Sequence, residues 1–492
     1  MFNHRPLPFL RPLATAALAV QCLLAAVAAP DGAAGLIINE IMPANIDMFV
    51  DPSYNYGGFV EIYNPTAKAV ALAGLYVSDD AEDLGKHRLV AATPSVPAHG
   101  FATLWFDHCD RYCPTQVSYK LDCDGGTIYL SDADGRVVAE QDYPAAFSRA
   151  SYARTTDGGD EWSWTSTPTP GATNAGSVFA SEQLAAPRVS LSSRVFTTSV
   201  TFSVTCPTGC TLRYTTDGST PTLTNGITAT SMRMSTTRTT TYRFRLFADG
   251  MLPSPVVTRS YLQTSRQMTL PMLSVVTDNK HVYGSELGLF TVGPHGRPGN
   301  GRDDKCNWNM DWDRPVNMEL IDTDGTVLLN QEADMAACGG WSRAYSPHSF
   351  KLKAEKQYEG QNYFPYAVFP TKPYNKNKTL QVRNGGNDNG CRIKDAALQE
   401  IVSRSGLNVD AQATVPVQHF LNGQDIGVLN IREPNNKHFV YANYGYDSDE
   451  IDQFEISPDS NYIQMTGTKE AFYRWYKLAE KAEDDEDEEM DT

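Results

Sequence analysis

Residues 339–353 read Gly-Gly-Trp-Ser-Arg-Ala-Tyr-Ser-Pro-His-Ser-Phe-Lys-Leu-Lys. The two glycines predict a tight turn, because glycine reaches backbone angles that other residues avoid. The alternation that follows predicts a strand with apolar side chains on one face and Lys351 and Lys353 on the other. Two ammonium groups beside a glycine turn and Arg343 can bind an anion. The solvated outer face of an edge strand explains the same pattern, so both interpretations stay open.

A helix is predicted further along the chain, at residues 395–406. Asp395 is a good N-cap residue and Gly406 is a good C-terminal stop. Three apolar residues are spaced for one buried stripe on this helix, namely Leu398, Ile401 and Val402. Glu400 lies on the same helix, and its direction is not fixed by the pattern.

A β-hairpin is predicted after this helix. Asn422-Gly423 separates two strand-like runs, 415–421 and 426–432, and this dipeptide favours the tight turns of hairpins. The order of these elements matches the small lobe of a protein kinase: a glycine turn, a strand with lysines, a helix with a glutamate and a hairpin. In that lobe a lysine holds the nucleotide phosphates and the helix glutamate holds the lysine.

The whole region 270–482 is similar to the CotH kinase family. Six motifs carry the resemblance in the family's order: Asp311-Trp-Asp-Arg-Pro315, Gly340-Trp-Ser-Arg343, Ser349-Phe-Lys-Leu-Lys353, Arg383-Asn-Gly-Gly-Asn-Asp388, Phe420-Leu-Asn-Gly423 and Leu429-Asn-Ile-Arg-Glu433. The resemblance implies an atypical, exported, kinase-like fold. It also implies that ATP and Mg²⁺ or another divalent metal are used to phosphorylate serine in secreted or coat proteins.

The resemblance assigns roles to four cofactor-binding candidates in the first half of this region and on its helix. Lys351 is the first choice for the lysine that holds phosphate, and Lys353 is the second. Glu400 would hold that lysine, and a solvated helix face is the alternative. Arg343 would meet phosphate through two parallel hydrogen bonds or form a surface salt bridge instead.

Arg383 and Asp388 match the family's Arg-Asn-Gly-Gly-Asn-Asp run. The resemblance implies that Arg383 binds the nucleotide and that Asp388 is a catalytic or metal-binding carboxylate. A tight Gly-Gly turn alone would also explain the glycines of this run. The ligands of the metal stay unassigned.

The chain departs from the family after Pro434. Kinase-type phosphoryl transfer needs a large lobe that supplies a base and a metal-holding Asp, and the family's later Trp-Asp-x-Asp type segment is absent. The expected fold is multi-domain: two all-β immunoglobulin-like sandwiches, then an α+β protein-kinase-like lobe that is apparently truncated. Residues 483–492 are expected to form an acidic, disordered tail.

Two strand-rich segments precede the kinase-like region. Residues 36–175 alternate apolar and polar residues over short runs, and the runs at 36–45, 59–65 and 72–79 resemble the lamin-tail domain family. This resemblance implies an adhesion or spacer module. Residues 186–263 resemble the chitobiase/β-hexosaminidase C-terminal-like module through the run at 212–221. The second resemblance implies glycan contact, although a hairpin spacer explains the same residues.

Residues 1–28 predict a cleaved secretory signal, because a positive start, an apolar run and Ala26-Val-Ala28 follow in order. The expected location is therefore secreted, periplasmic or cell-surface, with no transmembrane span after cleavage.

Export favours disulfides, and Cys206 and Cys210 are predicted to close a local loop. A second group is open to zinc or to disulfides: His108, Cys109, Cys113 and Cys123.

Composition excludes some classes of function. The net charge of −17 repels nucleic acid. The sequence also lacks the phosphate-loop, zinc-protease and nucleophile-turn motifs of other enzymes. The alternative to a kinase acting on a secreted or surface protein is a non-catalytic surface protein that binds glycan, cell wall or protein. Four tryptophans could stack on sugars or belong to the core: Trp162, Trp164, Trp308 and Trp312.

Overall fold

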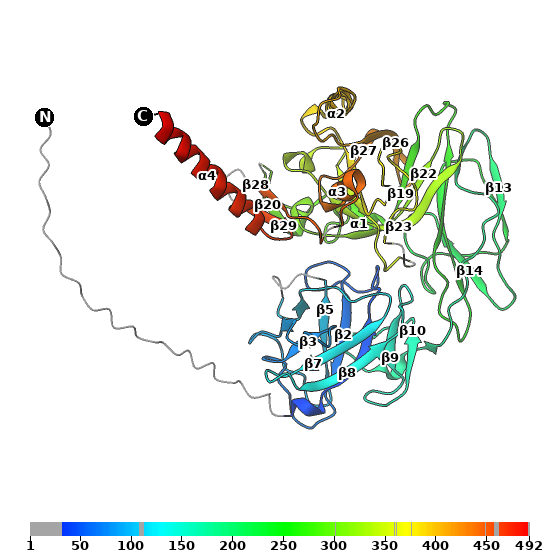
Figure 1. Ribbon diagram of the computed structural model, residues 1–492. Helices are drawn as coiled ribbons and strands as arrows, with labels where there is room; N and C mark the ends of the chain where they lie inside the picture. The colour runs from blue at the N-terminus through cyan, green and yellow to red at the C-terminus, as the bar shows by residue number, and fades with distance from the viewer. Residues whose placement is uncertain are drawn as a thin grey trace, which may run out of the picture.

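The computed structural model describes residues 32–490 apart from 108–112, 301, 359, 361, 375, 448 and 457–461. The expected signal at 1–28 lies outside the described residues, as do His108 and Cys109 of the possible zinc group. Strands dominate the described residues, and few of these residues are helical. Three β-rich modules follow one another along the chain, and the second and third lie side by side above the first in Figure 1.

The first module is a sandwich of two sheets. The larger sheet has the order β11-β10-β9-β1-β2-β5-β6, with β1 (Ile37–Met42), β2 (Gly58–Tyr63), β5 (Phe101–Phe106), β6 (Gln116–Val117), β9 (Ser151–Arg154), β10 (Trp162–Thr165) and β11 (Phe179–Ala180). The smaller sheet has the order β4-β3-β7-β8, with β3 (Tyr76–Ser78), β4 (His87–Arg88), β7 (Gly126–Ser131) and β8 (Val137–Tyr143). Apolar side chains from both sheets meet in one core, as the alternating pattern predicts.

The second module is a smaller β-sandwich. Its five-stranded sheet has the order β12-β18-β17-β14-β15, with β12 (Arg194–Phe196), β14 (Thr211–Thr215), β15 (Ile227–Thr228), β17 (Thr240–Phe247) and β18 (Val257–Gln263). Its second sheet pairs β13 (Val200–Ser203) with β16 (Arg233–Thr236). Aromatic rings fill the space between them, and Phe202 stacks on Tyr261 with ring centroids 4.8 Å apart.

The third module is a closed barrel of seven strands. Their order is β19-β22-β23-β24-β25-β27-β26, with β19 (Met272–Val276), β22 (Arg314–Ile321), β23 (Val327–Ala337), β24 (Phe350–Lys353), β25 (Thr379–Arg383), β26 (Thr414–Leu421) and β27 (Gln424–Arg432). β19 closes the barrel, because it pairs antiparallel with β22 and parallel with β26. Alternate residues of each strand point inward and form the largest hydrophobic core.

The helices lie outside the barrel and are α1 (Asn279–Val282), α2 (Lys394–Arg404), α3 (Lys437–Tyr444) and α4 (Glu470–Met490). Two hairpins complete the fold, β20 (Val292–Gly299) with β21 (Arg302–Cys306) and β28 (Gln453–Ile456) with β29 (Tyr462–Thr466). α4 extends away from the body (Figure 1). Among the described residues, the helices are all too short or too polar to span a membrane.

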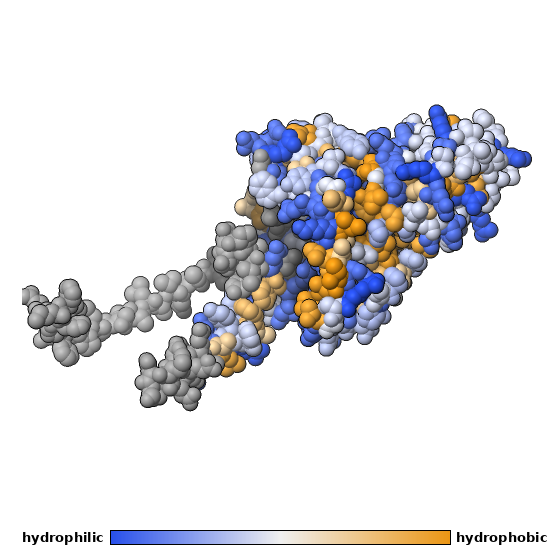
Figure 2. Space-filling view, turned by 90° about the horizontal axis from the view of Figure 1, so that it is seen from above, coloured by the Kyte–Doolittle hydropathy of each residue, from blue (hydrophilic) through white to orange (hydrophobic). Residues whose placement is uncertain are grey.

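Two local predictions in this module are confirmed and two are wrong. The helix and the Asn422-Gly423 hairpin form as α2 and as β26–β27. However, the stripe expected to be buried on α2 is open to solvent, with Leu398 52% and Ile401 62% exposed. Polar contacts hold this helix instead, such as the backbone N–H of Gln412 donating to the side chain of Gln399. Figure 2 shows that apolar residues reach the surface on the face seen from above.

The second wrong prediction concerns the acidic end. The chain is helical through Met490, whereas a disordered tail was expected from residue 483. Glutamate, lysine and alanine have high helix propensity, and α4 is rich in all three, so the helix continues into the acidic run.

The predicted disulfide between Cys206 and Cys210 does not form. Both are free thiols, and the Cys206 thiol points to the backbone carbonyl of Cys210 at 3.3 Å rather than to its sulfur. The other cysteines of the described chain are also free, including Cys113 and Cys123 of the possible zinc group.

The tryptophans expected to stack on sugars or to lie in the core are mostly buried. Trp164, Trp308 and Trp312 lie in the interior, and Trp162 stacks on Tyr152 with ring centroids 5.1 Å apart. The core interpretation therefore holds for these rings.

A buried ion cluster joins the three modules. The Glu332 carboxylate on β23 accepts from Arg149 of the first module at 3.0 Å and from Arg243 of the second at 2.9 Å. Arg149 also pairs with Asp47 at 2.7 Å, and Thr220 of the second module donates to Asp47 at 2.6 Å. Two acids and two bases balance each other, which is the condition for charges to be buried without a large cost.

Replacing Glu332 with Gln is expected to destabilise the junction by about 3–5 kcal/mol, because Arg243 and Arg149 would be left buried with one carboxylate between them. The midpoint of urea unfolding measures this loss. Glu400→Gln is the matched control, since it breaks the exposed pair with Arg404 and should cost less than about 1 kcal/mol. Equal midpoints for the two variants would contradict a central role for the cluster.

The buried Glu61 of β2 predicts a pH dependence of stability. Burial raises its pKa to about 8, although Asn39 donates to it at 3.0 Å and the backbone N–H of Gly171 at 2.7 Å. The folded chain therefore binds a proton that the unfolded chain releases, so stability falls as pH rises from about 5 to 8, by up to about tenfold in the unfolding constant per pH unit. Glu61→Gln should flatten this slope between pH 7 and 8 in urea titrations. An unchanged slope would show that Glu61 is charged in the folded state.

Candidate functional site

The outer face of β24 carries the two lysines predicted from the sequence. Phe350 and Leu352 point into the barrel and are buried. Lys351 and Lys353 point outward, as the alternation predicts. Lys353 lies opposite Asp334 of β23 in the ladder. The two lysines have different surroundings and are described in turn.

Lys353 forms an ion pair with Asp313. The Nζ atom lies 2.5 Å from Oδ1 and 2.6 Å from Oδ2 of that carboxylate. Burial lowers the pKa of Lys353, but the charges of Asp313 and Asp334 outweigh it, so the pKa lies above its ordinary value. Asp313 directly precedes β22 and belongs to the Asp-Trp-Asp-Arg-Pro motif at 311–315, so it holds the lysine from a different element than the predicted Glu400.

Asp334 lies beside this pair and is buried. It accepts from the hydroxyl of Tyr358 at 2.6 Å and from the side-chain amide of Gln357 at 3.3 Å. Burial and then the charge of Asp313 raise the pKa of Asp334 to about 6, while the charges of Lys120 and Lys353 lower it. Asp334 therefore takes up a proton at a higher pH than an ordinary aspartate does.

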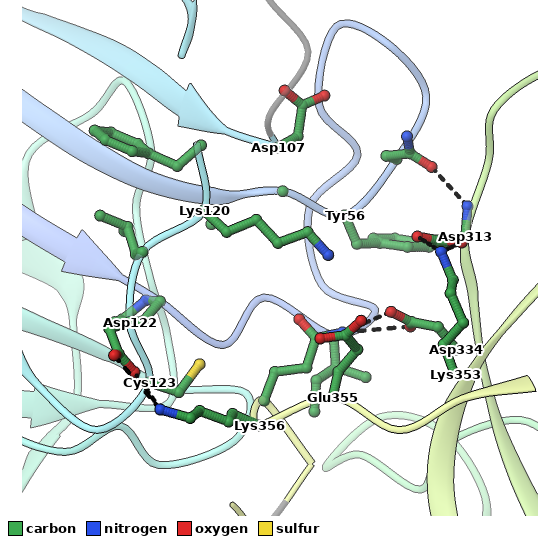
Figure 3. Close-up of a pocket in the computed structure, with 18 of the residues that line it drawn as sticks. Tyr56, Asp107, Lys120, Asp122, Cys123, Asp313, Asp334, Lys353, Glu355 and Lys356 are labelled. Atoms are coloured by element: carbon green, nitrogen blue, oxygen red, sulfur yellow. Dashed lines mark hydrogen bonds and ion pairs between the residues drawn. The ribbon is translucent and has the colours of Figure 1, made fainter. Parts of the chain in front are cut away.

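The Lys353–Asp313 pair faces a cavity of about 370 Å³ between the first module and the barrel. Figure 3 shows the charged residues that converge on it, and these are Asp107, Lys120, Asp122, Asp313, Asp334, Lys353, Glu355 and Lys356. Lys120 extends into the space from the first module (Figure 3), and Lys356 of the barrel pairs with Asp122 of the first module at 3.2 Å. The cavity is thus built by two modules.

The carboxylates around Lys120 raise its pKa. Burial lowers the pKa of Lys120, but the carboxylates of Asp334, Asp313 and Glu355 raise it above the ordinary value. Lys120 was not predicted from the sequence, because no motif marks it.

Lys351 belongs to a second group of cations, with Arg343 and Arg383. All three act on the buried thiol of Cys338: burial raises its pKa, and the positive charges of Arg383, Lys351 and Arg343 lower it. None of the three forms an ion pair with a carboxylate of the described chain, and the Nε atom of Arg383 is buried without a hydrogen-bond partner there. We call Lys351, Arg343 and Arg383 the cationic group.

The glycine turn shapes the edge of the cationic group. Gly339 has φ 102°, and a Cβ there would lie 2.6 Å from the hydroxyl of Ser342, so only glycine fits. The Arg343 guanidinium donates to the backbone carbonyls of Gly339 and Trp308, the latter at 3.3 Å. Trp341 is 64% exposed at the same turn.

The structure places Asp388 and Glu400 on or beside α2. The Asp388 carboxylate accepts from the backbone N–H groups of Ile393 at 2.9 Å and Lys394 at 2.6 Å, and so caps the start of the helix. Glu400 pairs with Arg404 one turn further along at 2.5 Å. The solvated helix face that was the alternative for Glu400 matches this position.

A metal centre has no evident ligand set in the part of the chain that the structure describes. No group of three His, Cys, Asp or Glu side chains there is arranged to hold a metal ion. The carboxylates nearest Lys353 are already engaged, because Asp313 pairs with that lysine and Asp334 accepts from Tyr358.

Three segments of the chain match known family models. Residues 336–492 match the CotH kinase protein family, residues 29–145 match the Lamin Tail Domain and residues 191–258 match the Chitobiase/beta-hexosaminidase C-terminal domain. These matches confirm the three resemblances seen in the sequence. The cationic group and Lys353 both lie within residues 336–492, the segment that matches the CotH kinase family. No curated protein matched the chain.

Asp388→Ala is expected to destabilise α2 by about 1 kcal/mol, because two backbone N–H groups lose their acceptor. Hydrogen exchange of the α2 amides measures this loss. Asp388→Asn keeps an oxygen acceptor and should restore most of the protection. Unchanged exchange in the Ala variant would contradict the capping role.

Proposed function

We propose that this chain acts as a CotH-like kinase that binds ATP on the outer face of β24 and β25 and phosphorylates a protein hydroxyl. The match of residues 336–492 to the CotH kinase family supports the reaction class. In the reaction, the bond between the γ-phosphorus and the β–γ bridging oxygen breaks while a bond to the acceptor oxygen forms, and the hydroxyl proton leaves to a base. Catalysis of this kind depends on positioning and on stabilising phosphate charge.

The single observation that carries the proposal is the cationic group. Lys351 on β24 pairs with Gln381 of β25, and Arg383 lies on the same outward face of β25. The side chain of Asn384, at the end of β25, donates to the carbonyl of Ser342 at 3.3 Å and so ties the turn that carries Arg343 to this face. None of the three cations pairs with a carboxylate among the described residues. Half-buried cations without counter-ions are costly, so the arrangement favours an anionic ligand. Arginine matches phosphate with two parallel hydrogen bonds, and lysine supplies a point charge. A triphosphate fits this donor set.

The Lys353–Asp313 pair supports the same site. Kinases hold a lysine of the phosphate site with an acid. Asp313 holds Lys353 in this way, whereas Glu400 was expected to hold the phosphate lysine, with Lys351 as the first choice. Lys351 and Lys353 are two residues apart on one strand face, which places them about 7 Å apart. A phosphate chain that lies along β24 can therefore meet both ammonium groups.

The family resemblance also favours a divalent cation, which would neutralise phosphate charge when bound. Among the described residues, no set of three His, Cys, Asp or Glu side chains is arranged to hold this cation.

The leader-like start and the other two modules support a proposal about the location and the class of acceptor. We infer that the chain is exported and acts on a secreted or surface protein. The chitobiase-like match of residues 191–258 favours glycan contact by the second module.

Lys351→Ala is expected to weaken binding of a non-hydrolysable ATP analogue by about tenfold or more, equal to about 1.4 kcal/mol. Lys353→Ala should weaken it less, because that lysine is already neutralised by Asp313. Isothermal titration of the full chain with and without Mg²⁺ measures both.

Lys280→Ala is the matched control, since Lys280 pairs with its neighbour Asp278 on the exposed start of α1. Its affinity should equal that of the wild type. A wild-type chain that binds no nucleotide would refute the proposed function, and a larger loss in Lys353→Ala would reverse the order of the two lysines.

A further inference from the structure

One loop of the first module, residues 51–57, lies against the barrel beside the cavity. Asp51 organises this loop from within. Its carboxylate accepts from the backbone N–H groups of Ser53 at 2.8 Å, Asn55 at 2.9 Å and Gly57 at 3.0 Å. Asp51 is buried, so these bonds are shielded from water. The loop therefore presents a defined surface to the barrel.

Tyr54, in the middle of the loop, is held by the barrel. Its φ angle of 65° lies in the left-handed region, which costs energy for a residue with a large side chain. The ring stacks on His295 with centroids 3.6 Å apart and packs against the barrel core. Contacts with the third module thus stabilise a loop conformation that the first module alone would disfavour.

The loop binds the Asp-Trp-Asp-Arg segment at each position. The Asn55 side-chain oxygen accepts from the backbone N–H of Asp313 at 3.0 Å and from Arg314 at 3.3 Å, and its amide donates to the carbonyl of Asp311 at 3.1 Å. The indole N–H of Trp312 donates to the carbonyl of Ser53 at 2.8 Å. A single asparagine therefore bridges both sides of Asp313.

Arg314 adds a second contact to the backbone of Asp313. It is fully buried, it donates to the carbonyls of Leu287 at 2.6 Å and Asp313 at 2.7 Å, and its guanidinium lies 4.6 Å from the centre of the Trp312 ring. Burial lowers the pKa of Arg314 to about 10. The backbone of Asp313 is thus held by Asn55 through its N–H and by Arg314 through its carbonyl.

We propose that Asn55 is a positioning residue for Lys353. The first module fixes the backbone of Asp313, the Asp313 carboxylate fixes the lysine, and docking of the first module is therefore part of assembling the phosphate site. This inference rests on the proposed function, in which Lys353 meets the phosphate chain together with Lys351. It also explains why the cavity beside Lys353 has walls from two modules.

The test is the reactivity of the Lys353 amine in the full chain. An isotope-coded acetylating reagent modifies only neutral amines, so at about pH 9 a lysine with a raised pKa reacts slowly. Mass spectrometry gives the labelling rate of Lys353 relative to Lys351 in one sample. Asn55→Ala should raise this ratio by about threefold or more, because Asp313 no longer holds the ammonium form, and each pKa unit is tenfold in neutral amine.

Two variants separate positioning from general destabilisation. Asn55→Gln keeps the amide oxygen that accepts from the Asp313 N–H and the amide N–H that donates to the Asp311 carbonyl, adds no charge beside Lys353, and should restore the wild-type ratio. Asn174→Ala removes another buried asparagine of the first module, which donates to the carbonyl of Arg154 at 2.8 Å, and should leave the ratio unchanged. Equal ratios in Asn55→Ala and Asn174→Ala would overturn the proposal. If Asn55→Ala does not fold, Asn55→Ser takes its place, because its shorter side chain also loses the bridge, and an unchanged ratio in that variant would overturn the proposal.

Titration of the same samples with the ATP analogue tests the positioning role of Asn55 separately from the proposed function. With the positioning role, Asn55→Ala should weaken binding of the ATP analogue and Asn174→Ala should not. A wild-type chain that binds no nucleotide refutes the proposed function, while the labelling ratio still decides whether the first module controls Lys353.

Discussion

The carboxylate of Glu332 is the point at which the three modules meet. It lies on β23 of the barrel and accepts from one arginine of each sandwich, Arg149 and Arg243. All three side chains are shielded from solvent, so their attraction is stronger than that of a surface pair, and the loss of one partner would leave the others uncompensated. The arrangement of the modules follows from this constraint. The first module must lie near the barrel, and its loop 51–57 and Lys120 then reach the face that carries Lys353.

The secondary structure of single strands and turns could be predicted from the sequence, because it depends on residues that are neighbours along the chain. The alternation in Ser349–Ala354 predicted which side of β24 carries Lys351 and Lys353, and the Asn422-Gly423 dipeptide predicted the β26–β27 hairpin. The prediction that the apolar face of α2 is buried was wrong, because burial depends on contacts with distant parts of the chain. Spacing shows that apolar residues share a helix face, but only the tertiary structure shows whether a neighbour covers that face.

The candidate site was predicted in part. The cationic residues were found because motifs mark them. Glu400 of α2 was expected to hold the phosphate lysine, Lys351 or else Lys353, whereas the carboxylate that pairs with Lys353 belongs to Asp313, 40 residues before it in the chain. Lys120 could not have been found, because it belongs to another module and no local pattern links it to the cavity. Asp388 matched a motif, but a carboxylate near a helix start can serve the backbone as well as chemistry, and here it caps α2.

Closure of the seven-stranded barrel limits how the proposed kinase can recognise a protein acceptor. An open sheet can extend itself with a peptide from a partner, because its border strands have unpaired backbone groups. In the barrel each strand has a neighbour on both sides, so no such border is left for strand addition. Under the proposed function, an acceptor polypeptide is therefore selected through side chains and loops, and its main chain gains no sheet hydrogen bonds from the barrel strands.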